Sequence, residues 1–260
     1  VLREIGAAEA IVGTKVKLSP SDFTDIPNAI ATQIENSLER LGLDTVDIVY
    51  THDRLGMKSS PGQGIVSERE LGQVVDVFDR FVNAGKIRYW GFNGLGETSA
   101  IKTCVEQFRP SGIHTCFNML NASSVEDAPP SFSYQDYENL SRVASNVGAG
   151  TVAIRVLAAG ALTGTPERHE IAAPAVAPIA TGETLEEDFN RASAFSFLVA
   201  EGYVSSMVEA AVRFSISFEE ISTSLVGLSS FDHIKEAISA AEKGPFDGEV
   251  LERLKDLRTT

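Results

Sequence analysis

The chain has 260 residues, of which 43% are hydrophobic and 22% charged, a composition typical of a soluble globular protein with a sizeable core. The formal net charge of −14 argues against nucleic acid or an anionic membrane surface as a partner, because both require clustered cations. No apolar run approaches the roughly 20 residues of a membrane helix, and residues 1–10 lack a signal-peptide pattern. We therefore expect a cytoplasmic protein.

The cysteines and the N-terminus each give one expectation. Cys104 and Cys116 have no Cys or His partners at metal spacing, so the sequence predicts buried thiols without a disulfide framework or metal site. Leu2, Ile5 and Ala8 have the spacing of a helix end that runs directly into a strand. Because residue 1 is Val, the sequence looks cut, or else begins abruptly.

Strands and helices are predicted to alternate along the chain. A β-branched run at 11–16 predicts a strand, and apolar residues at helical spacing predict a helix with Pro27 at its entry and Gly42 at its exit. Further strands are predicted at 46–51, 87–92, 113–117, 151–156 and 223–226. Further helices are predicted at about 68–84, 99–108, 135–146, 187–199, 204–217, 231–241 and 249–257.

This alternation predicts an α/β fold with a parallel sheet covered by helices on its faces, since the strands are apolar runs. One domain over residues 1–260 is expected, of the (β/α)8 barrel type. A barrel unit averages about 30 residues, so about two strand-helix units would be absent if the parent fold is the full barrel. The segment 172–182, rich in Ala and Pro, is expected to be a surface loop that can serve as a lid.

Two strand-end residues are candidates for chemistry. Lys15 lies in an apolar run, where a charge is costly unless it faces a cavity or a partner, and His52 ends the strand at 46–51. A snorkelling lysine and a structural histidine are the alternatives. Together, an ammonium and an imidazole over the barrel mouth suit carbonyl chemistry, because a donor polarises the substrate oxygen and a cation depresses the pKa of the proton donor.

Several segments resemble the aldo-keto reductase family, in the family's order and over essentially the whole chain. The segments are 13–16, 37–52 with its terminal His52, 85–94 for the fifth strand, 117–121 for the sixth, 157–164 for the seventh and 225–236 for the eighth with its helix start. The sequences at 94–98 and 155–160 resemble those of the family branch that acts on sugars such as galactose, fucose or arabinose.

The resemblance implies hydride transfer between a nicotinamide cofactor and a sugar or small carbonyl or alcohol substrate. It assigns catalysis to Lys15 and His52, which match two members of a tetrad of Asp, Tyr, Lys and His. The Asp and Tyr would lie upstream of Val1, and none of the five tyrosines takes the place of the missing one. Cofactor binding is assigned to Asn93, His114, Arg155, Leu157, Gly160, Gly227, Ser229, Ser230 and His233.

The chain departs from the family at the cofactor residues. Asn93 and Gly94 stand where Ser-Asn is common, and His114 stands where Gln is usual. Ser229 and Ser230 replace the Arg or Lys of members that prefer NADP, so NAD is favoured over NADP. The same serines beside Gly227 can form an anion site at a helix N-terminus, although, taken alone, they are better explained by an ordinary Ser-capped helix.

Three functions follow from these observations. The first is an NAD(P)-dependent oxidoreductase; the second is a truncated, redox-inactive relative that binds, has a structural role or performs non-redox acid-base chemistry. The third, a sugar-phosphate lyase or isomerase on an unrelated barrel, does not explain the ordered matches. A barrel that lacks two units would have open sheet edges, which predicts either partner pairing, such as a homo-oligomer, or unrecorded upstream residues.

Overall fold

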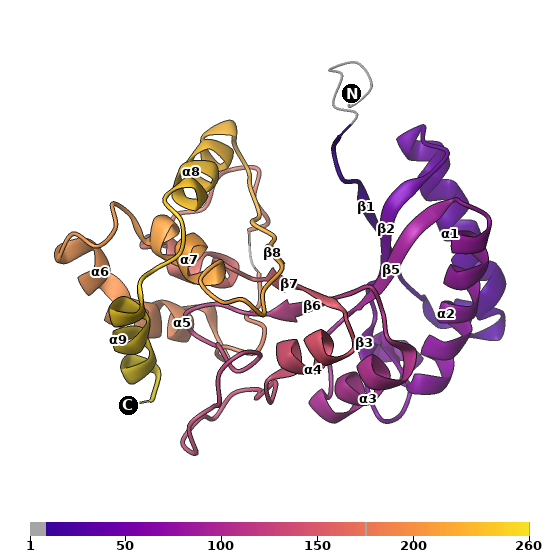
Figure 1. The fold of residues 1–260 in the computed structure, drawn as a ribbon, viewed down its shortest axis with the longest axis horizontal. Helices are drawn as coiled ribbons and strands as arrows, with labels where there is room; N and C mark the ends of the chain where they lie inside the picture. The colour runs from indigo at the N-terminus through magenta and orange to yellow at the C-terminus, as the bar shows by residue number, and fades with distance from the viewer. Residues whose placement is uncertain (1–8, 175, 260) are drawn as a thin grey trace. The chain divides into compact units, whose positions relative to one another are not determined.

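A computed structural model describes residues 9–174 and 176–259 (Figure 1). The expected helix end with Leu2, Ile5 and Ala8 lies outside these residues. The chain forms two compact units: unit 1 is Val1–Ile113 with Val147–Ala149, and unit 2 is His114–Asn146 with Gly150–Thr260. The single domain expected over residues 1–260 stays a prediction.

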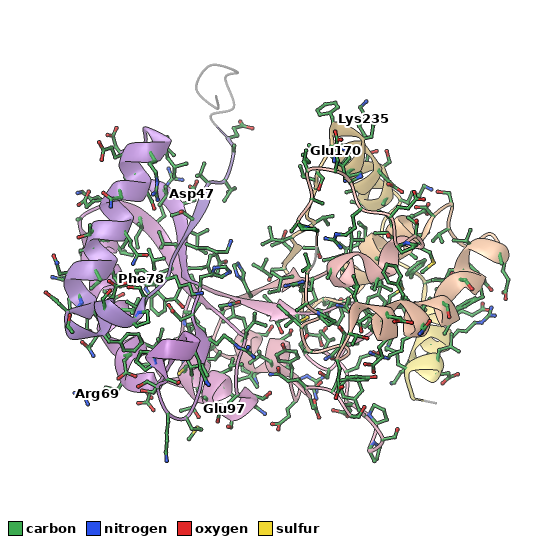
Figure 2. All side chains as sticks on the ribbon, turned by 180° about the vertical axis from the view of Figure 1, so that it is seen from behind. Asp47, Arg69, Phe78, Glu97, Glu170 and Lys235 are labelled. Atoms are coloured by element: carbon green, nitrogen blue, oxygen red, sulfur yellow. The ribbon has the colours of Figure 1, made fainter. Side chains whose placement is uncertain are left out.

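Unit 1 is built on three parallel strands in the order β1 (Gly13–Val16), β2 (Val46–Thr51) and β5 (Ile87–Asn93). Asp47, labelled in Figure 2, ties these strands together: its carboxylate accepts from Val12 N at 2.8 Å and pairs with Arg88 Nη1 at 2.9 Å. Because the three strands are parallel, their carboxyl ends lie at one edge of the sheet.

Helices α1 (Ile26–Leu41) and α2 (Glu68–Asn83) pack side by side, α1 on β1 and α2 on β5 (Figure 1). The apolar face of α2 includes Phe78, labelled in Figure 2, whose ring lies 6.0 Å from that of Trp90. Gly42 ends α1 in the left-handed conformation, with φ 63°, which a residue without Cβ adopts at little cost. Helix α3 (Thr98–Phe108) follows β5, as expected.

Unit 2 contains the parallel strands β7 (Gly150–Ile154) and β8 (Thr223–Ser224). The boundary between the units falls inside β6 (Gly112–Cys116). Its helices are α4 (Leu140–Asn146), α5 (Leu185–Ala192), α6 (Phe197–Ala200), α7 (Met207–Ser215), α8 (Phe231–Glu242) and α9 (Gly248–Thr259). Phe117 and Phe214 stack at 5.2 Å in the core of this unit, and α7 packs on α8 (Figure 1).

All six predicted strands are present, but several boundaries were wrong. The helix expected at 135–146 begins only at Leu140, because Glu138 and Asn139 take positive φ angles of 50° and 57°. The helix expected at 187–199 consists of α5, a 3-10 turn at Ser193–Ser196, and α6. Strand β7 stops before Arg155, whose φ of 61° leaves the extended conformation.

Short elements were missed by the sequence patterns. Strands β3 (Arg54–Leu55) and β4 (Ile65–Val66) form a parallel pair of two residues each, too short for a detectable period. Further 3-10 turns occupy Pro20–Thr24, Pro61–Gln63 and Ala158–Thr163. Within the described ranges, no helix is both long and apolar enough to cross a membrane.

Candidate functional site

Lys15 and His52 lie at the carboxyl ends of neighbouring parallel strands in unit 1. Lys15 is in register with Tyr50, and His52 N donates to Val16 O at 2.7 Å. Side chains two residues apart on a strand share a face, which places Lys15, Tyr50 and His52 on the same side of the sheet. The register therefore places the two candidate side chains on one face of the sheet, and their catalytic roles stay a prediction.

The imidazole of His52 is biased towards its neutral form. Partial burial is the largest cause of its lowered pKa, and the positive charges of Lys15 and Lys17 lower the pKa further. A neutral imidazole has one N–H donor and one acceptor nitrogen. At neutral pH, His52 can therefore donate a hydrogen bond to a substrate oxygen without carrying a charge.

Asp53, directly after His52, is a buried carboxyl group. It is 2% exposed, and its two oxygens accept from Leu18 N at 3.2 and 3.3 Å. Burial raises its pKa from 3.8 to about 6, although the Leu18 amide and the charge of Lys17 act in the opposite direction. This carboxyl group links the loop after β1 to the end of β2 and thereby fixes the backbone on both sides of the Lys15–His52 pair.

Asp53 is expected to make stability fall as pH rises from about 4 to 6. The folded state retains a proton that the unfolded state releases near pH 3.8, so ionisation of the buried carboxyl group costs about 2 to 3 kcal/mol by pH 7. Asp53→Asn removes this titration. The unfolding free energy of the variant minus that of wild type should therefore rise by about that amount across this window in urea titrations. If the difference in unfolding free energy between Asp53→Asn and wild type did not change with pH, the raised pKa of Asp53 would be contradicted.

Tyr50 is buried between Lys15 and β5 and is a poor proton donor. Gly91 leaves room for its ring: a Cβ there would lie 2.6 Å from the Cε1 atom of Tyr50. Burial raises the pKa of the Tyr50 phenol to about 12. Its position beside Lys15 therefore does not make it a substitute for the tyrosine of the family's tetrad.

Asn93 ends β5 with an unsatisfied acceptor. The residue is 3% exposed, and its Oδ1 atom has no hydrogen-bond partner among the residues that the structure describes. Leaving a buried amide oxygen unpaired costs about 1 to 3 kcal/mol, so the binding of a hydrogen-bond donor at this atom would be favourable. A primary amide donor, such as that of a nicotinamide carboxamide, would satisfy it.

Unit 2 contains a pocket of about 520 Å³. Six of the residues assigned to cofactor binding line it: Arg155, Leu157, Gly160, Gly227, Ser229 and His233. Ser230 caps α8 beside it, where its hydroxyl accepts from His233 N at 3.3 Å. His114 is buried in β6 and is not one of the lining residues, so the structure leaves it apart from this group.

The backbone beside this pocket has an unusual conformation. Arg155, Ala158 and Ala159 have φ angles of 61°, 45° and 57°, and Gly160 follows with 106°. Non-glycine residues adopt positive φ only at an energetic cost, and such residues concentrate at ligand sites. The sequence pattern did not predict this conformation, because only Gly160 is a residue type that favours positive φ.

The pocket also contains basic residues that sequence reasoning missed. Arg168 and His169, from the loop after β7, line it together with Arg155 and His233. The ring of His169 lies 5.9 Å from that of His233, and Figure 2 shows Glu170 and Lys235 at this end of unit 2, where the loop meets α8. Glu167 is the one acidic residue among the lining residues. No spacing rule points to loop residues, which explains why they were not predicted.

The two cysteines are buried free thiols, as expected. Burial is the main cause that raises the pKa of each to about 12, so neither is a reactive thiolate at neutral pH. Across residues 9–174 and 176–259, no three His, Cys, Asp or Glu side chains gather in a way that could hold a metal ion.

The sequence model of the aldo/keto reductase family matches residues 5–259. The chain therefore belongs to this family. Its strands and helices accordingly form an α/β fold of the barrel type, as the alternation of strands and helices predicted.

The chain is also similar to individual proteins. The chain is 27% identical over 244 residues to the L-galactose dehydrogenase of Arabidopsis thaliana, an alignment that covers 91% of this chain and 65% of that protein. An aldo-keto reductase from Bacillus halodurans has a similar fold. Its apo form matches with a TM-score of 0.64 at 17% identity over 96% of this chain and 72% of its own, and its holo form with 0.65 at 18% over 96% and 73%.

Proposed function

We propose that the protein is an NAD(P)-dependent oxidoreductase that transfers a hydride between nicotinamide and a sugar or small carbonyl or alcohol substrate. The observation that carries this proposal is the pocket of unit 2, because six of the nine residues assigned to the cofactor from sequence line one cavity of about 520 Å³. Pockets that bind small molecules and cofactors usually have volumes of about 300 to 1,000 Å³.

The residues present fit a dinucleotide. Its phosphates carry negative charge, and the pocket lining has two arginines and two histidines but one glutamate, in a chain of net charge −14. The N-terminus of α8, capped by Ser230, adds a favourable dipole for an anion. In unit 1, considered by itself, the unpaired Oδ1 of Asn93 is an acceptor that suits a primary amide.

Lys15 and His52 would act on the substrate oxygen in this proposal. His52, neutral at neutral pH, donates a hydrogen bond that orients and polarises this oxygen. The ammonium of Lys15 lowers the pKa of the group that exchanges a proton with the oxygen. The nicotinamide, when bound, supplies or accepts the hydride.

The relative in Arabidopsis thaliana suggests an aldose as substrate, because its name is that of an L-galactose dehydrogenase. The test measures binding before turnover. NADH and NADPH are titrated against the protein by nicotinamide fluorescence, and a panel of aldoses that includes L-galactose is then assayed with both coenzymes. Saturable binding and coenzyme-dependent turnover are expected. A folded protein that binds neither coenzyme would overturn the oxidoreductase proposal and leave the redox-inactive alternative.

Coenzyme preference is expected to depend on Ser229 and Ser230. We propose that NAD is preferred, because neither side chain supplies a cation for a 2′-phosphate. Ser229→Arg should therefore raise the affinity for NADPH by about tenfold, the value of one charge-assisted hydrogen bond, and leave that for NADH within about twofold. Ser229→Gln is the control of similar length without charge. An equal gain for both coenzymes would contradict this role.

A further inference from the structure

We infer, on the basis of the proposed function, that Asp53 is a positioning residue of the reaction. Its carboxyl group holds the Leu18 amide and thereby sets how Lys15 and His52 lie relative to each other, and its ionisation makes this geometry depend on pH. Three features of unit 1 support this role: a hydrogen bond that replaces a rung of the sheet, the way the loop after β1 is held, and the charges around the carboxyl group.

The hydrogen bond between Leu18 and Asp53 takes the place of a backbone rung. Beyond the last paired residues of β1 and β2, a regular parallel ladder would continue with Leu18 N donating to a backbone carbonyl. Leu18 N donates instead to the two side-chain oxygens of Asp53, at 3.2 and 3.3 Å. The chain after β2 turns towards β4, where Arg54 N donates to Gly64 O at 3.1 Å. A carboxyl group titrates and a carbonyl does not, so the rung nearest the candidate site can respond to pH.

The loop after β1 is held so that a change at Leu18 reaches Lys15. Gln33, on α1, donates from Nε2 to Lys17 O at 2.9 Å and accepts from Lys17 N at 2.9 Å. Lys15 lies three residues before Leu18, and the histidine of the pair directly precedes Asp53. A longer bond between Leu18 and Asp53 would therefore separate the backbones that carry the pair. A misplacement of about 1 Å can lower a rate by about 10²-fold, so this separation matters.

The charge of the carboxyl group changes near neutral pH. The charged or titratable groups that flank it in the fold or in the sequence are Lys17, Asp22, His52 and Arg54. Burial raises the pKa of Asp53 to about 6; Lys17 favours the ionised form and Asp22 opposes it. The segment 61–66, which pairs with the chain after β2, contains no titratable side chain. Hydrogen bonds to an ionised acceptor are about twice as strong as neutral ones, so the bond from Leu18 should tighten as pH rises through about 6.

Histidine NMR tests this role without any need for turnover. The chemical shift of His52 Hε1 is followed against pH, and the spectrum of His52→Gln assigns this resonance among the four histidines. We expect the wild-type curve to depart from a single ionisation, with a component near pH 6 that comes from Asp53. Asp53→Asn should lack this component, because its amide oxygen still accepts from Leu18 N but does not titrate.

Two further variants serve as controls for the NMR measurement. In Asp22→Asn the Asp53 component should move to lower pH, because a negative charge that opposes ionisation of Asp53 is removed. Gln33→Ala breaks an uncharged tie to the same loop and should leave the component in place.

Turnover gives a second readout. In His52→Gln, where the imidazole no longer titrates, kcat should rise by about fivefold through pH 6, and adding Asp53→Asn should abolish this rise. Asp53→Ala, which removes the contact with Leu18 at every pH, should lower kcat by about tenfold or more and leave the affinity for NADH within about twofold. Asp53→Asn should recover most of this loss at neutral pH, since it keeps the contact.

Each other outcome overturns the inference. A His52 curve with a single ionisation in wild type, or one that Asp53→Asn leaves unchanged, would separate Asp53 from the pair. Equal kcat losses in Asp53→Ala and Asp53→Asn at every pH would mean that the contact with Leu18 does not position the pair. If Asp53→Asn loses its native circular dichroism, the shift of the component in Asp22→Asn decides. A wild-type protein that shows the Asp53 component but binds no coenzyme would refute the proposed function and with it a role in this reaction. The NMR curves distinguish that result from a failure of Asp53 to act on His52.

Discussion

Replacing His52 with alanine is expected to lower kcat by about 10² to 10⁴-fold, the range for removal of one positioned acid-base or hydrogen-bonding group. The reason is the position of the imidazole beside Lys15, at the ends of paired parallel strands, with a lowered pKa that keeps it neutral. The measurement is the steady-state rate of coenzyme reduction or oxidation with the best aldose of the panel.

The affinity for NADH is the control for this variant, because His52 lies outside the pocket of unit 2. His52→Gln should retain more activity than His52→Ala, since an amide still donates a hydrogen bond but does not titrate. An alanine variant with wild-type kcat would exclude His52 from the reaction.

Gly91→Ala is expected to destabilise the protein by about 3 kcal/mol or more, at the upper end of the range for overpacking. A Cβ at this position would lie 2.1 Å from the carbonyl oxygen of Gly112 and 2.6 Å from the ring of Tyr50. Neither can move freely, because Gly112 belongs to β6 and Tyr50 is buried in β2. The free energy of unfolding from urea titrations measures the effect.

The matched control is Gly62→Ala, also in unit 1, where an added Cβ meets no atom within 4 Å and the backbone has no positive φ. This variant should keep its stability within about 0.5 kcal/mol. Equal stability of the two variants would mean that β5 and β6 separate more easily than the close approach at Gly91 implies.

The Gly91 variant also probes the candidate site. Tyr50 is the register neighbour of both Lys15 and Gly91, so a displaced Tyr50 ring disturbs the face on which Lys15 and His52 lie. We therefore expect the residual folded fraction of Gly91→Ala to lose turnover, while the pocket of unit 2 retains coenzyme affinity.

The sequence by itself determined the order of the elements and the candidates at the strand ends. Strand β2 lies at the predicted residues 46–51, and α1 has Pro27 near its start and Gly42 at its end, because apolar periodicity and helix termini are local signals. Residues that follow parallel strands reach the same edge of the sheet in any such fold, which is why Lys15 and His52 could be paired before the structure was known.

Tertiary structure alone decided the properties that depend on contacts distant in sequence. The raised pKa of Asp53 comes from its burial against the Leu18 amide, and the unpaired oxygen of Asn93 depends on which groups surround the end of β5. Arg168 is held by two backbone carbonyls, and every residue type has a backbone carbonyl, so no pattern of side chains predicts this arrangement. Its place in the pocket lining depends on the path of the loop, to which hydrogen bonds from Cys116, Asn121 and Arg191 contribute.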